Sequence, residues 1–205
     1  MPQNDEPRVV EPPRVLRAAD RSPQPWRNGG GVTFEVARRA APPQSVVEFL
    51  WRVSVARVES AGPFSSFAGY ERLIAVIEGS GMQLTGVAPQ SIALRPFEPF
   101  CFDGGASVTG ALPAGPVSDL NVIFDPRHCT ARLLIVAGEL SERRAACKEL
   151  LILNLGPAPM RCAIDSAIIE LDRRDAVWIT SPDATVSCRS VERAAVIEID
   201  HAAQT

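Results

Sequence analysis

The chain has 205 residues, a formal net charge of −3 and a sequence pI of about 5.5. It has no basic block with interleaved aromatic residues, which excludes the usual pattern of a nucleic-acid-binding protein, and no apolar run approaches the roughly 20 residues needed to span a membrane. The N-terminus lacks a signal-peptide pattern, and five cysteines without a C-x-x-C spacing predict neither a disulfide framework nor a zinc site, so we expect a cytoplasmic protein.

Residues 1–21 are predicted to be a loose leader. Their first part, MPQNDEPRVVEPP, is rich in proline and polar residues, and such a composition cannot bury enough apolar surface to offset the entropy lost on ordering.

Three glycines follow, within the stretch WRNGGGVTFE at residues 26–35. A phosphate-binding P-loop would need a lysine and a following helix, and a Rossmann loop would need G-x-G-x-x-G, whereas this stretch leads into strand-like alternation. Asn28-Gly29 is the commonest type I′ pair, so a plain hairpin turn is one explanation. The extra glycines, Gly30 among them, would also suit a backbone that passes close to a neighbouring strand or a bound molecule.

Short apolar runs separated by glycine and proline predict an all-β fold. The clearest strand is residues 49–56, where Trp51 and Val53 lie on one face and Arg52 and Ser54 on the other. We expect the first face to pack into a core and the second to carry chemistry.

Further strands are predicted at residues 73–77 and 82–85, joined as a hairpin by the turn Glu78-Gly79-Ser80-Gly81, and at residues 120–124. Asp125-Pro126 ends the last of these and marks a boundary. Beyond it, the same pattern predicts strands at residues 132–137, 150–155, 168–171, 177–179 and 196–199. The segment 141–153 could alternatively form a helix, because it contains good helix formers. We therefore predict two β lobes, residues 22–126 and 127–201.

The loop at residues 62–72 is a candidate for the mouth of a pocket, because ligand sites are mostly apolar with a few convergent polar groups. Phe64, Ser65, Phe67 and Arg72 come from this loop, and Arg52 comes from the strand before it. The two phenylalanines could instead close the end of the lobe. An arginine could bind a ligand carboxylate through two parallel hydrogen bonds.

Arg52 could alternatively form a structural salt bridge with Glu35 or Glu71, since an arginine inside a barrel must be paired. Asn121 interrupts an apolar run, so its amide must bond either the backbone or a ligand. An amide or imidazole ligand would suit polar groups that donate and accept hydrogen bonds, namely Asn28, Thr33, Ser54 and Asn121.

Five segments occur in a fixed order: WRNGGGVTFEVA, FLWRVSVARV, GPFSSFAGYERLIAVIEGSGMQL, FDGG and SDLNVIF, spanning residues 26–124. In this the chain resembles the HutD/Ves family. The resemblance implies a bicupin of the cupin superfamily, with two jelly-roll-like β-barrel lobes. It also implies a bacterial accessory or regulatory component of histidine utilisation that binds urocanate or a formyl-glutamate-like carboxylate.

The residues agree with a site that contains no metal. Cupin enzymes hold a divalent metal through several histidines and a glutamate, whereas this chain has only His128 and His201, neither of them on a first-lobe strand. We expect no cofactor.

We therefore predict a metal-independent protein that binds a small molecule in the first lobe, with the second lobe as support. The alternative is a cofactor-free isomerase or hydrolase acting on a small carboxylate, with Glu35 or Asp103 as acid or base. A third hypothesis is an interaction module whose edge strands form a homodimer.

Overall fold

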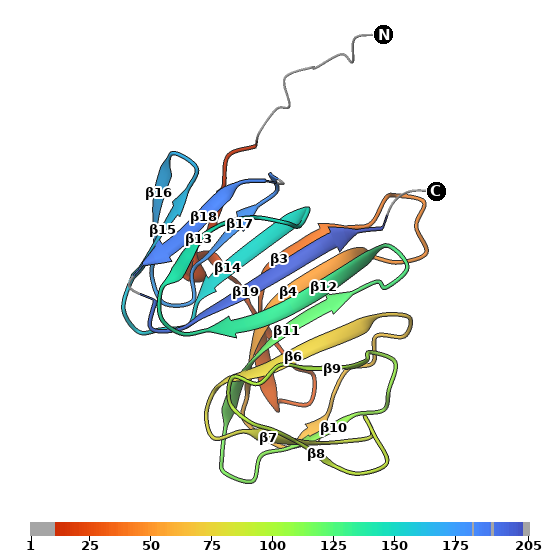
Figure 1. Cartoon of the computed structure of the whole chain (residues 1–205). Coiled ribbons are helices and arrows are strands. Elements are labelled where there is room, and N and C mark those ends of the chain that lie inside the picture. The colour runs from red at the N-terminus through yellow and green to blue at the C-terminus, as the bar shows by residue number, and fades with distance from the viewer. Residues whose placement is uncertain (1–10, 182, 190, 203–205) are drawn as a thin grey trace.

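The computed structural model describes residues 11–202, except 182 and 190. This part of the chain folds into antiparallel strands that form four sheets, with one short 3₁₀-helix, so the predicted all-β fold is confirmed (Figure 1). The described residues include no helix that is long and apolar enough to cross a membrane.

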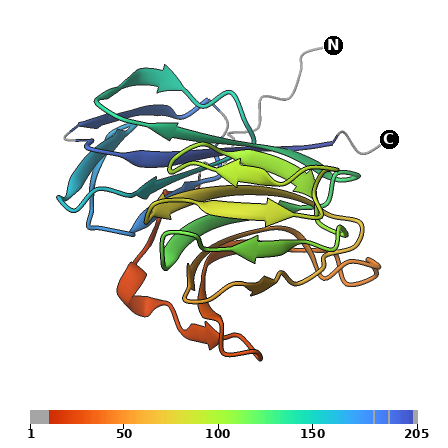
Figure 2. The ribbon, with the colours of Figure 1, turned by 90° about the horizontal axis from the view of Figure 1, so that it is seen from below.

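The first lobe consists of a six-stranded and a four-stranded sheet, with strand orders β2-β3-β4-β11-β6-β9 and β5-β10-β7-β8. The bounds of its strands are β2 Pro23–Pro25, β3 Gly31–Ala40, β4 Phe49–Val58, β5 Gly62–Pro63, β6 Glu71–Glu78, β7 Met82–Thr85, β8 Ile92–Leu94, β9 Phe100–Asp103, β10 Thr109–Ala111 and β11 Val117–Phe124. Figure 2 shows these strands stacked in layers, with the teal and blue strands of the second lobe toward the upper left.

The second lobe consists of a five-stranded and a four-stranded sheet, with strand orders β1-β17-β14-β19-β12 and β13-β18-β15-β16. Its elements are β1 Arg14–Leu16, the 3₁₀-helix η1 Ala18–Asp20, β12 Cys129–Val136, β13 Leu140–Arg144, β14 Glu149–Asn154, β15 Met160–Ile164, β16 Ala167–Leu171, β17 Ala176–Ile179, β18 Thr185–Arg189 and β19 Ala194–His201. Because β12 follows the Asp125-Pro126 stop, we propose to keep the division of the lobes there.

The predicted loose leader needs correction at residues 14–20. β1 pairs with β17 of the second lobe. Arg17, the residue that follows β1, forms a salt bridge with Asp175 at 2.6 Å. The partner strand lies about 160 residues further along the chain, so no local sequence pattern signals the pairing. Residues 1–10 of the predicted leader lie outside the described residues.

The strand predicted at residues 150–155 is confirmed as β14, and the alternative helix over residues 141–153 is not formed, because this segment contains β13 and β14 and alternate residues of β14 pack into two different cores. One further expectation is corrected. Strands β6 and β7 exist as predicted but do not form a hairpin, since each belongs to a different sheet. Gly79 and Gly81, with φ of +91° and +119°, turn the chain from one sheet to the other.

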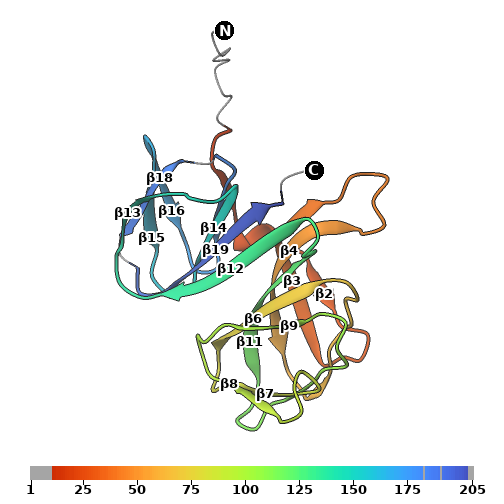
Figure 3. The same ribbon diagram turned by 45° about the vertical axis from the view of Figure 1, so that its right-hand side comes forward.

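The two lobes share one apolar core. The alternation within β4 and β11 turns Trp51, Val53 and Leu120 toward the second lobe, where they pack in one cluster with Leu151 and Ile197. Figure 3 shows β12, β14 and β19 beside β3 and β4 at this junction.

The interiors of the two lobes differ in chemistry. The second lobe is filled by apolar side chains such as Leu150, Ile152 and Met160, all at most 1% exposed. In the first lobe, Ile74 and Leu84 fill only part of the interior, and polar residues occupy the rest of the inner face of the six-stranded sheet. The fold therefore supplies one packed lobe and one lobe with room for a site.

Candidate functional site

A cavity of about 520 Å³ lies against the inner face of the six-stranded sheet. Strands β3, β4, β6 and β11 supply its floor, and the β2–β3 connection and the loop after β5 supply its walls. Its lining residues are Gln24, Pro25, Trp26, Arg27, Asn28, Thr33, Arg52, Ser54, Ala56, Pro63, Phe64, Ser65, Phe67, Arg72, Asp119, Asn121 and Ile123.

The structure brings together all but one of the predicted ligand-binding residues. Those that line the cavity are Asn28, Thr33, Arg52, Ser54, Phe64, Ser65, Phe67, Arg72 and Asn121. Gly30 does not line it. Its amide donates to the Asn28 side chain at 3.0 Å, and its carbonyl accepts from the backbone of Glu59, so Gly30 belongs to the turn.

Asn28-Gly29 lies in the hairpin that joins β2 and β3, as one explanation predicted, but the turn is not of type I′. Gly29 has φ of +69°, but Asn28 does not have the positive φ that a type I′ turn requires, and a hydrogen bond from the Gly29 amide to the Trp26 carbonyl closes the turn. At Gly31 a Cβ atom would lie 2.5 Å from the Arg57 carbonyl oxygen and 3.1 Å from the Trp26 ring. The close approach that the glycine run suggested is therefore to a neighbouring strand, at Gly31.

We expect Gly31→Ala to lower the free energy of unfolding by about 2 kcal/mol, because backbone and a tryptophan ring must move to admit the methyl group. Gly30→Ala is the matched control. Its Cβ would meet only the ends of two polar side chains, Ser60 Oγ at 3.0 Å and Asn28 Oδ1 at 3.3 Å, which can move more easily than backbone, so the loss should be clearly smaller. Urea denaturation of both variants makes the comparison, and equal losses would contradict the steric explanation.

Arg52 has no acidic partner within ion-pair distance among the described residues. The alternative salt bridge is not formed, since Glu35 pairs with Arg38 at 3.6 Å and Glu71 contacts Cys101. The Arg52 guanidinium lies 5.3 Å from the centre of the Phe67 ring, and its buried Nε has no hydrogen-bond partner. Burial lowers the pKa of Arg52. This cation therefore faces the cavity with unused donors.

The side chain of Arg72 is held by more contacts than that of Arg52. Its Nη2 donates to the Asn121 side-chain oxygen at 2.6 Å, and its guanidinium lies 5.1 Å from the Phe64 ring centre and 5.6 Å from that of Phe67. Burial lowers the pKa of Arg72 to about 10, and its Nε is buried without a partner. Phe64 and Phe67 thus line the cavity and make cation–π contacts with the arginines, so they do more than close the end of the lobe.

The Asn121 side chain lines the cavity and bonds two other side chains instead of the backbone. Its oxygen accepts from Arg72 and its nitrogen donates to the Asp119 carboxylate, so both ends of the amide are engaged by side chains. Thr33 is also engaged, since it accepts a hydrogen bond from Trp26 Nε1 at 2.8 Å.

Asp119 is the functional candidate that the sequence reasoning missed. It lines the cavity, is only 1% exposed, and has a pKa raised to about 7 by burial, against the attraction of Arg72. The signal was present in SDLNVIF, because Asp119 stands two residues before Asn121 and strand alternation puts both on one face.

The register across the sheet sets the order of the charges. Ile123 of β11 lies opposite Arg52 on one side and opposite Arg72 on the other, so the two arginines flank it in one row. Asp119 lies four residues along β11 from this row, with Asn121 between them. Along the direction of β11, the cavity therefore presents two cations at one end, beside Ile123, and the Asp119 carboxylate at the other.

The remaining acidic and histidine candidates lie elsewhere. Neither Glu35 nor Asp103, proposed as an acid or base, lines the cavity, and Asp103 accepts from the Gly105 amide at 2.8 Å. His128 binds Asp125 and His201 binds Glu149. Within the described part of the chain, no three side chains of His, Cys, Asp or Glu are grouped so that they could hold a metal ion.

Comparisons with known proteins agree with this architecture. The model of the HutD family matches residues 18–197. An uncharacterised 21.2 kDa protein in the hutC 3′ region of Pseudomonas putida is 42% identical over 120 residues, which cover 58% of this chain and 62% of that protein. This chain therefore spans less than two thirds of the length of that curated relative.

Solved structures match more of the chain. The structure of HutD from Pseudomonas fluorescens SBW25, obtained in a formate condition, has a TM-score of 0.82 and 32% identity, covering 94% of this chain and all of that one. The bacterial pirin YhhW from Escherichia coli, in complex with nickel(II), has a TM-score of 0.66 at 9% identity, covering 94% of this chain and all of that chain, which shows a shared cupin-like fold alone.

Proposed function

Since this chain belongs to the HutD family, we propose that it is an accessory protein of histidine utilisation that binds a small carboxylate, such as urocanate or formyl-glutamate, without a metal. The family match and the relative in the hutC 3′ region support a role linked to histidine utilisation. The carboxylate ligand is proposed from the cavity.

The observation that carries the proposal is the state of Arg52. A half-buried guanidinium with no ion-pair partner among the described residues is costly, and an entering carboxylate would relieve that cost through charge-assisted hydrogen bonds. Arg72, with its own unbonded Nε, stands in the same cross-strand row. Two such cations on one cavity floor favour an anionic ligand. Binding would then stabilise the protein by mass action and could report ligand concentration to a partner.

Titration calorimetry of the protein with urocanate, histidine and formyl-glutamate tests this function. We expect saturable binding of at least one carboxylate ligand, and Arg52→Gln should weaken it about 10- to 100-fold, because a charge-assisted hydrogen bond contributes about 1.5–3 kcal/mol. Arg57→Gln is the matched control: it lies on the same strand, but its side chain is 65% exposed and paired with Glu59. Equal affinities of the two variants, or no binding of any ligand, would contradict the proposal.

One observation favours a second candidate, a cofactor-free enzyme. A buried carboxyl in a cavity with a pKa of about 7 is suited to exchange a proton with a substrate near neutral pH. Analysis of the ligand recovered after titration separates the two candidates. Unchanged ligand supports a binding protein, whereas altered ligand, with turnover lost in Asp119→Asn, supports an enzyme.

A further inference from the structure

Asp119 differs from the other buried carboxylates of this protein. Asp125 accepts hydrogen bonds from the Arg127 side chain and backbone and contacts the His128 ring. Asp175 accepts from the side chain of Arg17 and from two backbone amides. In both, the partners of the carboxylate lower its pKa. The chain thus surrounds its structural carboxylates with donors.

Asp119 is left with far fewer donors. Within the described part of the chain, the amide nitrogen of Asn121 is its sole hydrogen-bond donor. The orientation of that amide is fixed, because Arg72 donates to its oxygen. An ionised carboxylate offers about four acceptor sites, so most of those on Asp119 have no partner although the side chain is 1% exposed. The group lines the cavity, and the missing donors can come from a molecule that enters it.

We propose that Asp119 is the specificity-determining residue of this cavity and selects carboxylates that also carry an N–H donor. The inference rests on the proposed function and narrows its ligand class. The ligand carboxylate occupies the arginine end of the cavity, and its N–H group donates to Asp119. An anion without a donor leaves the Asp119 carboxylate unsatisfied and adds repulsion, so it binds less well.

A pair of ligands that differ in one group tests the inference. Urocanate and 3-(furan-2-yl)acrylate share an acrylate carboxylate and a planar five-membered ring, but only urocanate has a ring N–H. At pH 8 we expect the parent protein to bind urocanate at least about tenfold more tightly, since sites built to bond an N–H reject analogues that lack it. In Asp119→Asn the ratio should fall to about threefold or less. Asp103→Asn, an exposed carboxylate outside the cavity, should keep the parent ratio.

The outcomes separate this inference from the proposed function. Equal binding of both ligands to the parent protein, or an unchanged ratio in Asp119→Asn, would overturn the role of Asp119 and leave carboxylate binding in place. Binding of neither ligand, together with no binding of formyl-glutamate, would overturn the proposed function and this inference with it. Circular dichroism of each variant confirms that it is folded before its affinity is compared.

Discussion

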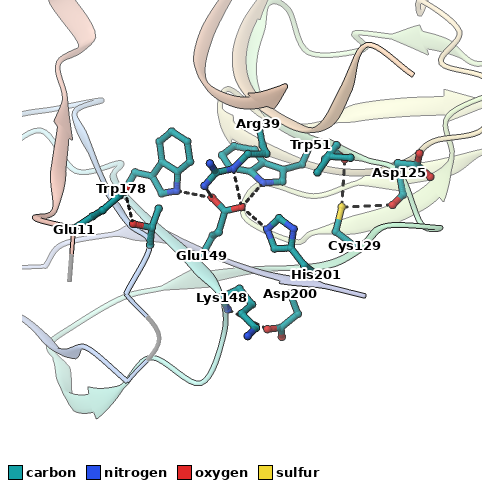
Figure 4. Close-up of polar contacts among 12 residues, drawn as sticks. Glu11, Arg39, Trp51, Asp125, Cys129, Lys148, Glu149, Trp178, Asp200 and His201 are labelled. Atoms are coloured by element: carbon teal, nitrogen blue, oxygen red, sulfur yellow. Dashed lines mark hydrogen bonds and ion pairs between the residues drawn. The ribbon is translucent and has the colours of Figure 1, made fainter. Parts of the chain in front are cut away.

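Replacing Glu149 by Gln should lower the free energy of unfolding by about 3 kcal/mol or more. Glu149 is 2% exposed, and its carboxylate lies at the junction of the two lobes (Figure 4). Arg39 and Trp51 of the first lobe donate to it at 2.7 and 2.9 Å, Trp178 of the second lobe donates at 2.9 Å, and the His201 ring contacts it at 2.5 Å.

The loss of stability is large because all four partners place a nitrogen atom against the Glu149 carboxylate, which can only accept hydrogen bonds. A glutamine would turn an NH₂ group toward one or more of the donors, leaving buried indole N–H groups unsatisfied at about 1–3 kcal/mol each, and it would remove the charge that pairs with Arg39. Urea denaturation measures the effect.

Glu48→Gln is the matched control for this change. Glu48 pairs with Arg38 at 3.0 Å, but its side chain is 77% exposed, so the same substitution should cost less than about 1 kcal/mol. If both substitutions cost the same, the Glu149 cluster does not join the lobes in the way its geometry indicates.

Strand alternation was sufficient to predict part of the cavity floor, whereas the loop residues such as Phe64 and Phe67 were predicted from the composition of their loop. A period of two puts Arg52 and Ser54 on one face of β4. The same rule applied to β11 puts Asn121 and Asp119 on one face, so it would also have selected Asp119. Gly30 was misplaced because a glycine run has the same local pattern whether it approaches a ligand or a neighbouring strand. Only the packing of Gly31 against Arg57 distinguishes the two.

The features that escaped prediction depend on contacts between distant parts of the chain. The Glu149 cluster collects residues from five strands, β3, β4, β14, β17 and β19, and no spacing motif links them. The pairing of β1 with β17 likewise has no local signal. The turn after β6 contains Gly79 and Gly81, and glycines at such positions are typical of a hairpin. They suit a connection between two sheets equally well, which is what the structure shows.

Buried charge serves different ends in the two parts of the molecule. At Glu149 the carboxylate is fully supplied with donors, so it joins the lobes and stabilises the fold. In the cavity, Arg52 and Asp119 are charged side chains with unused hydrogen-bonding capacity, which costs stability in the ligand-free protein. Sites that must bind a ligand commonly retain such a cost.

The second large effect is therefore a gain: Asp119→Asn should be more stable than the parent protein at pH 8. The pKa of Asp119 is about 7 in the folded protein and 3.8 in its ordinary state, and the folded value already includes the attraction of Arg72. Because one pKa unit corresponds to about 1.4 kcal/mol, ionised Asp119 destabilises the fold by on the order of 4 kcal/mol. Asparagine keeps the shape and an acceptor for Asn121 but carries no charge.

The pH dependence identifies the cause of this gain. Between pH 3.8 and about 7 the folded state binds the Asp119 proton more tightly than the unfolded state, so the stability of the parent protein falls as pH rises through this window. The advantage of Asp119→Asn should accordingly be near zero below pH 4, grow up to pH 7 and remain constant above it. Urea denaturation of both proteins at pH 4, 5.5, 7 and 8 measures that difference. A variant less stable than the parent at pH 8 would mean that the attraction between Asp119 and Arg72 outweighs the burial of the carboxylate, and Asp119 would then be a structural partner of Arg72 instead of an acceptor held ready for a ligand.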